Sequence, residues 1–153
     1  MSEALIIRPV VPEDLHQWRP LWDGYNRSYG RSGATALREE ITKTTWSRFF
    51  DLSEPVHALV AEKDRKLLGL VHYLFHRSTI LIEPRCYLQD LFTHEMARGQ
   101  GIGRALIEAV YERAERAGSP QVYWQTYETN VTAMRLYDSI AERSGFILYR
   151  RRV

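Results

Sequence analysis

Apolar side chains recur at the spacing of one helical face in four segments of the chain. The first covers residues 13–29 and the second residues 37–52, with the sequence YGRSG as the break between them. The third, residues 102–117, is the most regular, and a glycine and a proline follow it as a stop signal. The fourth begins at Asn130, which can cap a helix, and ends at Gly145. Its predicted buried face consists of Ala133, Leu136, Tyr137, Ile140 and Ala141.

Runs rich in β-branched and aromatic residues lie between these helices and predict strands. The sequence EKDRK separates two of the runs by a polar turn of hairpin length, which favours antiparallel pairing. In the second half of the chain strands and helices alternate, an order typical of a mixed sheet with helices on its faces. The predicted strands are residues 4–10, 56–62, 67–75, 86–93, 121–126 and 146–151.

The chain has 153 residues, no internal repeat and no low-complexity linker, so we expect a single domain over residues 1–153. Lys and Arg number 21 against 19 Asp and Glu, and the basic residues are dispersed apart from those at 150–152. This charge is too weak and too scattered for a nucleic-acid binder. One cysteine, Cys86, excludes an internal disulfide, and the start MSEALIIRPV has no long apolar run for a signal or a membrane span. We therefore expect a cytoplasmic protein with neither nucleic acid nor a membrane as partner.

Three glycines, Gly99, Gly101 and Gly103, lie between a predicted strand and the most regular predicted helix, with Arg98 before them. A helix N-terminus presents unpaired N–H groups and roughly half a positive charge, so a bare loop leading into it can bind an anion. Glycine lets backbone amides approach a phosphate and adopt unusual dihedral angles, and arginine adds a forked donor for phosphate oxygens. The loop therefore predicts a site for a pyrophosphate.

Three kinds of phosphate-binding loop compete for this sequence, beside a loop that only turns the chain. The P-loop requires Gly-Lys-Ser/Thr at its end, and this loop lacks that ending. The dinucleotide motif G-x-G-x-x-G fits poorly, because Leu106 follows where a glycine is needed and Tyr123 stands where an acid is expected. The third is Arg/Gln-x-x-Gly-x-Gly/Ala at a strand–helix junction, which is matched by RGQGIG at residues 98–103.

With the flanking sequences YLQDLF and TNVTAMRLYDSIAERSGF, this loop resembles that of the GCN5-related N-acetyltransferases (GNAT), which bind the pyrophosphate of acetyl-CoA there. The resemblance extends to IIRPVVPEDLHQWRPLWDGYN and LVAEKDRKLLGLVHYLFHRST, so it covers essentially the whole chain. The group around the yeast histone and polyamine acetyltransferases is most similar in VYWQTYETN and YDSIAERSGFILYRR. The resemblance implies an α/β (α+β) fold with a mixed, mostly antiparallel central sheet of about six to seven strands, flanked by about four helices.

The activity that the resemblance implies is direct attack of a primary amine on the thioester of acetyl-CoA, with no metal and no covalent intermediate. The histidines agree with the absence of a metal: His94 and Glu95 begin a sequence like H-E-x-x-H, but Arg98 stands at its last position. The implied acetyl-CoA contacts are Leu91, Phe92, Thr93, Arg98, Gly99, Gln100, Gly101, Ile102, Gly103, Arg104, Asn130, Ala133 and Tyr137.

Catalytic roles follow from the same resemblance. In the family the fourth strand splays open, and the matching backbone N–H of Leu91 would stabilise the oxyanion. The pattern N-x-x-A-x-x-x-Y places the acid for the departing thiolate at Tyr137, although core packing alone is an alternative role for this ring. Asp90 is the first candidate for the base and Glu128 the second, and either can equally be a surface carboxylate. Some polyamine-acetylating members carry an acidic pair where this chain has Gln89 and Asp90.

The acceptor is expected beside the first predicted helix, whose aromatic stripe includes Tyr25 and Tyr29. Their faces can attract a cationic amine, and Asp90 or Glu128 can anchor its charge, whereas most of the stripe packs in the core. Polyamine, amino acid, another small amine such as an aminoglycoside, and a lysine side chain all stay open as acceptors.

Two other functions compete with the acetyltransferase. One is a catalytically inactive acyl-CoA-binding regulatory domain, and the other is a nucleotide-binding oxidoreductase. The exposed edge expected for the C-terminal strand, together with the resemblance, favours a homodimer.

Overall fold

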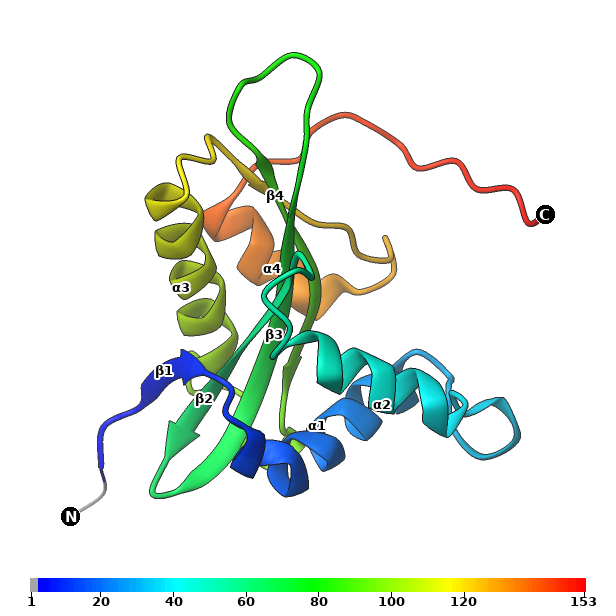
Figure 1. Cartoon of the computed structure of the whole chain (residues 1–153), viewed down its shortest axis with the longest axis vertical. Helices are drawn as coiled ribbons and strands as arrows, with labels where there is room; N and C mark the ends of the chain where they lie inside the picture. The colour runs from blue at the N-terminus through cyan, green and yellow to red at the C-terminus, as the bar shows by residue number, and fades with distance from the viewer. Residues whose placement is uncertain (1–2) are drawn as a thin grey trace.

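The computed structural model describes residues 3–153, and Figure 1 shows their arrangement. The strands are β1 (Ile6–Pro9), β2 (Val56–Lys63), β3 (Lys66–His76), β4 (Arg85–Thr93) and β5 (Val122–Tyr123). The helices are α1 (Leu15–Ser28), α2 (Glu39–Arg48), α3 (Ile102–Arg116) and α4 (Val131–Ile140), besides single turns of 3-10 helix. No helix in this part of the chain combines the length and the apolar character needed to cross a membrane.

The five strands form one mixed sheet in the order β1-β2-β3-β4-β5. The first four pair antiparallel, and β5 pairs with β4 in parallel. In the turn between β2 and β3, Asp64 and Arg65 adopt φ angles of 51° and 64°, the left-handed geometry that closes a tight hairpin. The predicted mixed, mostly antiparallel sheet and the predicted hairpin are therefore confirmed.

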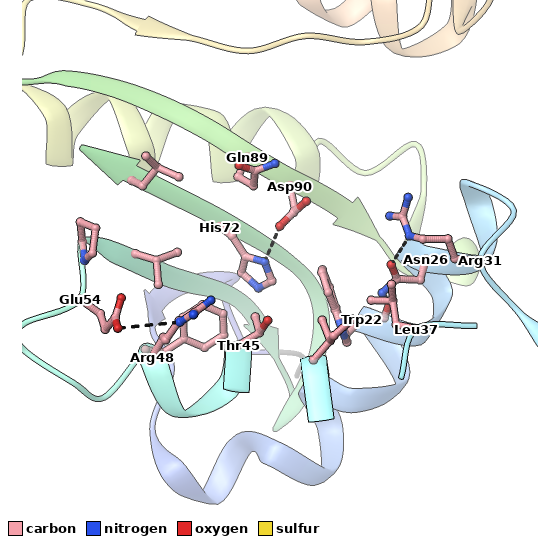
Figure 2. A pocket seen from close by; sticks show the side chains of 15 residues that line it. Trp22, Asn26, Arg31, Leu37, Thr45, Arg48, Glu54, His72, Gln89 and Asp90 are labelled. Carbon is pink, nitrogen blue, oxygen red and sulfur yellow. Dashed lines mark hydrogen bonds and ion pairs between the residues drawn. The ribbon is translucent and has the colours of Figure 1, made fainter. Parts of the chain in front are cut away.

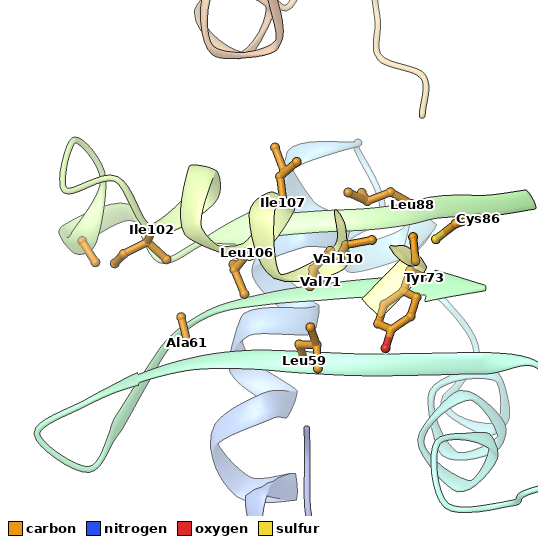
Figure 3. Packing of buried hydrophobic residues seen from close by; sticks show 12 residues of the cluster. Leu59, Ala61, Val71, Tyr73, Cys86, Leu88, Ile102, Leu106, Ile107 and Val110 are labelled. Carbon is orange, nitrogen blue, oxygen red and sulfur yellow. The ribbon is translucent and has the colours of Figure 1, made fainter. Parts of the chain in front are cut away.

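Side chains alternate along each strand, so the sheet has two faces. Helix α3 covers one of these faces. Figure 3 shows Leu59 and Val71 of the sheet packing beneath Leu106 and Val110 of α3. At the start of α3 the approach depends on Gly69 of β3. A Cβ at this position would lie 2.9 Å from the carbonyl oxygen of Phe92 and 3.0 Å from Cγ2 of Ile102. The bare backbone of β3 thus lets the helix N-terminus sit close to the end of β4.

Helix α1 packs on the opposite face of the sheet. Trp18 is fully buried and Leu21 almost so, against Val60 and Leu70 of the central strands. Helix α2 lies beside α1 and contributes Trp46, whose ring centroid is 4.8 Å from that of Trp18. The N-terminal members of the aromatic stripe predicted for α1, Trp18 and Trp22, therefore pack in the core, as expected for most of the stripe.

The C-terminal part of the chain corrects four predictions: the number of strands, the strand at residues 146–151, the length of the strand at residues 121–126 and the end of the fourth helix. The sheet has five strands rather than six to seven, because residues 146–151 form no strand and β5 is only two residues long. A strand needs a neighbouring edge, and Figure 1 shows the last residues leading away from the sheet. Helix α4 ends at Ile140 rather than at Gly145, since its apolar stripe stops at Ala141 and the polar sequence ERS follows.

Candidate active site

The glycine loop leads directly into the N-terminus of α3, as predicted. Gly99 and Gly101 adopt φ angles of 80° and 79°, in the left-handed region where a side chain is strained. Gly101 is the N-cap residue of α3, and nothing lies within 4 Å of a Cβ built on either glycine. The backbone conformation therefore favours glycine at both positions, whereas no neighbouring protein atom excludes a side chain there. The space in front of the loop is open.

The backbone N–H groups of residues 99–104 have no acceptor within the described residues. The first internal hydrogen bond of α3 runs from the N–H of Ala105 to the carbonyl of Gly101. Arg98 lies beside this group of amides, with its Nε donating to the Thr93 carbonyl at 3.3 Å and its guanidinium 5.6 Å from the centre of the Phe92 ring. Free amides, the positive end of a helix dipole and an arginine together make this loop a candidate anion site.

Strand β4 carries an irregularity two residues before the predicted oxyanion donor, Leu91. Asp90 lies opposite His72 of β3 and Leu88 lies opposite Tyr73, so Gln89 has no partner and forms a bulge. On its other side β4 pairs with β5 only at Cys86 and Tyr87. Beyond these two residues the outer edge of β4 has no strand beside it in residues 3–153, which is the open strand that the family resemblance predicts.

The open edge of β4 presents backbone donors. The N–H of His94, directly after β4, donates to the Leu68 carbonyl at 2.7 Å and therefore points toward β3. Since N–H directions alternate along a strand, those of Leu91 and Thr93 point away from β3 into the opening. A Cβ built on Gly103 would lie 3.8 Å from Oγ1 of Thr93 and 3.6 Å from Leu136 of α4. The glycine loop, the open strand and α4 therefore meet at one place.

Tyr137 lies on α4, directly after Leu136. Its ring is half-buried and packs edge-on against Trp124, with 5.4 Å between ring centroids. Burial, followed by the neighbouring Tyr29, raises the pKa of Tyr137 to about 12. The phenol therefore keeps its proton at every physiological pH, as a general acid must. Asn130 is the N-cap residue of α4, but its side chain donates to Oγ1 of Thr126 and makes no capping bond.

A pocket of about 570 Å³ lies between the α1 and α2 side and strands β3 and β4. Figure 2 shows Asp90 at its wall, with a dashed line to His72. His72 is 1% exposed, and its Nδ1 lies 2.9 Å from Oδ2 of Asp90. Its other nitrogen, Nε2, accepts a hydrogen bond from Nε1 of Trp18 at 3.1 Å. Because an indole N–H can only donate, Nε2 carries no proton, so a neutral His72 donates through Nδ1 and fixes the Asp90 carboxylate.

Several predicted substrate contacts do not line this pocket. Trp22 lines it, whereas Tyr25 and Tyr29 lie next along the aromatic stripe of α1 and are not among its lining residues. Glu128 is exposed on the loop before α4 and is likewise outside the pocket. Sequence reasoning missed His72, although a lone polar residue inside an otherwise apolar strand was a signal that could have identified it.

Cys86 is fully buried on β4, and burial raises the pKa of its thiol to about 12. It therefore packs as a small apolar side chain, as expected for a lone cysteine in a strand.

A family model described as Acetyltransferase (GNAT) family matches residues 18–141 of the chain. The chain belongs to this family. The resemblance read from the sequence is thereby confirmed, and the reading as a nucleotide-binding oxidoreductase is wrong. Acetyl transfer to amines from acetyl-CoA is the chemistry of GNAT enzymes, which makes this chain an N-acetyltransferase.

Individual relatives agree with this membership. The D-amino-acid N-acetyltransferase HPA3 of Saccharomyces cerevisiae is 33% identical over 153 residues, which cover 99% of this chain and 92% of the relative. A ribosomal-protein-alanine N-acetyltransferase from Brucella melitensis biovar Abortus 2308 superposes with a TM-score of 0.80 at 20% identity, over 99% of this chain and 100% of the other. AAC(6′)-Iy in complex with a bisubstrate analogue gives 0.82 at 15% identity, over 99% of each chain. The two solved structures share the fold of this GNAT chain.

Proposed function

We propose that this GNAT enzyme transfers an acetyl group from acetyl-CoA to a primary amine by direct attack of the amine on the thioester. One observation carries the proposal: the free amides of residues 99–104 lie beside the open edge of β4, where Leu91 and Thr93 present N–H groups. The first group suits a pyrophosphate, and the second suits the amide-bearing pantetheine arm and the thioester carbonyl.

The residues that would hold acetyl-CoA follow the glycine loop and the two elements beside it. The amides of Gly99 to Arg104, with Arg98, would bind the pyrophosphate, and the backbone from Leu91 to Thr93 would bind the pantetheine arm. Asn130, Ala133 and Tyr137 would border the arm from α4. Bound acetyl-CoA supplies the activated acyl group, and the chain supplies positioning, proton transfer and charge stabilisation.

Three residues have catalytic roles in this proposal. The Leu91 N–H donates to the carbonyl oxygen of the thioester as negative charge develops there. Asp90 pairs with the ammonium of the acceptor and takes its proton, so that the neutral nitrogen can form the C–N bond while the C–S bond breaks. Tyr137 gives its proton to the departing sulfur. Since a free thiol has a pKa of about 8.5 and Tyr137 one of about 12, full transfer is uphill by about 5 kcal/mol. We therefore expect proton transfer to be late or concerted with C–S cleavage.

A CoA-release assay with a panel of primary amines tests the proposal, with Tyr137→Phe as the diagnostic variant. We expect the variant to lower kcat about 100-fold with little change in the KM for acetyl-CoA, because only the proton donor is lost. The phenol holds its proton below its raised pKa, so wild-type kcat should not fall from about pH 7 to about pH 10 through Tyr137.

The matched control is Tyr111→Phe, which removes a phenol from a ring 6.4 Å from the centre of the same Trp124 ring but on α3. It should leave kcat within about threefold of wild type. Tight CoA binding without turnover of any amine would favour the inactive acyl-CoA-binding domain instead. Loss of equal size in both tyrosine variants would remove the acid role from Tyr137.

The acceptor class in this proposal is a small amine. The yeast relative, which is 33% identical over nearly the whole chain, is named for amino acids, and this supports a small molecule over a lysine side chain in a protein. A pocket of about 570 Å³ is also of small-molecule size. The lone buried cysteine agrees with a cytoplasmic location for the reaction.

A homodimer completes the proposal. The side chains of Phe146, Ile147, Leu148 and Tyr149 are 73–91% exposed in a segment that leads away from the sheet (Figure 1). Strand β5, in turn, has no partner on its outer edge within residues 3–153. The apolar segment of one copy, which has high β-propensity, can pair with the open edge of β5 in a second copy, and the reverse contact forms at the same time.

Light scattering coupled to size-exclusion chromatography tests the dimer. We expect the full chain to elute at twice its mass of 17.9 kDa, and a chain lacking residues 146–153 to elute as a monomer. Leu148→Asp should weaken the dimer without shortening the chain, because a charge at an apolar contact is costly. A monomeric full chain at millimolar concentration would contradict the proposal.

A further inference from the structure

The pocket beside Asp90 carries a second charged group that the proposed reaction does not use. Arg31 follows α1 and lines the pocket at one end, and Figure 2 shows its guanidinium on the side of Asp90 that is away from Arg48 and Glu54. Among the described residues Arg31 has no acidic partner, and Asp90 has no Lys or Arg partner. A cation without an acidic partner and a carboxylate whose only ion-pair partner is a histidine thus line one cavity.

Arg31 is held in place by Asn26, which is 4% exposed. The Asn26 side chain donates to the Trp22 carbonyl at 2.9 Å and accepts from Nε of Arg31 at 2.7 Å. The backbone N–H of Arg31 also donates to the Asn26 carbonyl, at 2.9 Å. These bonds occupy Nε and leave Nη1 and Nη2 without an acceptor in residues 3–153. Two parallel N–H donors on a fixed guanidinium are suited to bidentate binding of a carboxylate.

Tyr25 is a neighbour of both charged groups. The Arg31 guanidinium lies 5.8 Å from the centre of the Tyr25 ring. Burial, followed by the charge of the nearby Asp90 carboxylate, raises the pKa of the Tyr25 phenol. Arg31 and Asp90 are therefore both neighbours of one tyrosine side chain, and a ligand that carries an ammonium and a carboxylate group would find a partner of opposite charge for each.

The remainder of the pocket is apolar or already neutralised. At the far end Nε of Arg48 lies 3.8 Å from Oε1 of Glu54, so these two charges compensate each other. The wall between the two ends includes Leu37, Ile41, Phe49 and Leu74. In this pocket Arg31 would repel the positive charges of a polyamine. Asp90 is the one lining carboxylate without an Arg or Lys partner, so the other ammonium groups of a polyamine would have no counter-charge.

We propose that the acceptor is a free α-amino acid with an uncharged, apolar side chain, and that Arg31 binds its carboxylate. Asp90, fixed by His72, binds the ammonium that becomes the nucleophile, and the apolar wall receives the side chain. The inference rests on the proposed function, since the bound amine is the one that is acetylated. It adds a residue that selects the substrate and does not touch the thioester.

Leucine and leucine amide, in both enantiomers, separate this inference from its alternatives, because they differ in the carboxylate and keep the amine. We expect wild type to favour leucine in kcat/KM by roughly 10- to 100-fold, the range for one charge-assisted interaction. Arg31→Gln should raise the KM for leucine by that factor, change kcat little, and leave leucine amide unaffected. Arg48→Gln, the matched pocket variant, should keep the preference for leucine.

Equal use of leucine and its amide by wild type, or a preference for spermidine over both, would overturn the inference. An equal loss on both substrates in Arg31→Gln would do the same, since it would indicate a structural role. The same two ligands should be tested for binding to the CoA-loaded protein by calorimetry. If no amine is acetylated, the proposed transfer fails, yet binding of leucine but not of its amide, lost in Arg31→Gln, would still support the zwitterion site.

Discussion

Replacing Asp90 with asparagine is expected to lower kcat/KM for the amine acceptor by about 100- to 1,000-fold and to leave the affinity for acetyl-CoA unchanged. Asparagine keeps the shape of the side chain and can still accept the hydrogen bond from Nδ1 of His72, which is 2.9 Å from Oδ2 in the native protein. What it loses is the negative charge and the capacity to take a proton. The loss should therefore appear in the step that uses the amine.

The pH dependence of this variant gives a second readout. A primary ammonium has a pKa of about 10, so the fraction of free amine rises with pH and the need for a base falls. The deficit of Asp90→Asn in kcat/KM should accordingly shrink as the pH approaches the pKa of the amine. A deficit that is constant over this range would indicate that Asp90 only positions the acceptor.

Glu128→Gln is the matched control for Asp90→Asn. Glu128 is the other carboxylate that the sequence offers as a base, but it is exposed and outside the pocket. We expect its removal to change kcat/KM by less than about threefold. A larger loss in Glu128→Gln than in Asp90→Asn would transfer the role of base to Glu128.

Substituting valine for Gly101 is expected to weaken CoA binding about 100-fold or more, measured by calorimetry. The φ angle of 79° strains any β-branched residue, so the loop must leave the conformation that aligns its amides. Its Cβ would also occupy the open space in front of those amides. Losing two charge-assisted hydrogen bonds, at about 1.5–3 kcal/mol each, accounts for a change of this size.

The same helix provides a control for the strain itself. Gly118 follows the other end of α3 with a φ angle of 76°, and the nearest atom to a Cβ there is Cγ of Glu83 at 3.7 Å. Gly118→Val should cost a similar amount of stability and leave CoA affinity unchanged. Equal effects of the two variants on CoA binding would mean that α3 responds to destabilisation at either end, and that the loop is not the anion site.

The central strands and α3 could be predicted from local pattern alone. Strands β2, β3 and β4 lie within one residue of the predicted ranges at each end, and α3 begins at Ile102 as predicted. These elements are buried against one another, so their apolar residues follow the period of the structure they adopt. The glycine loop could also be predicted, because left-handed φ angles favour glycine and the start of a helix follows from the local sequence.

The C-terminal region could not be predicted in the same way, because a strand depends on an edge that its own residues do not specify. Residues 146–151 have the composition of a strand, and yet no edge within residues 3–153 pairs with them. The pocket beside Asp90 was predicted only in part for a related reason. His72 and Arg31 line one pocket with Asp90 only when β3, β4 and the segment after α1 come together, and no spacing in the sequence encodes that contact.

A crystal structure of the protein with bound CoA tests the central claim most directly. We expect the pyrophosphate to lie on the amides of residues 99–104, and the pantetheine arm to run along the outer edge of β4 past Thr93 and Leu91. Phosphates bound elsewhere on the protein, with those amides still facing solvent, would contradict the account.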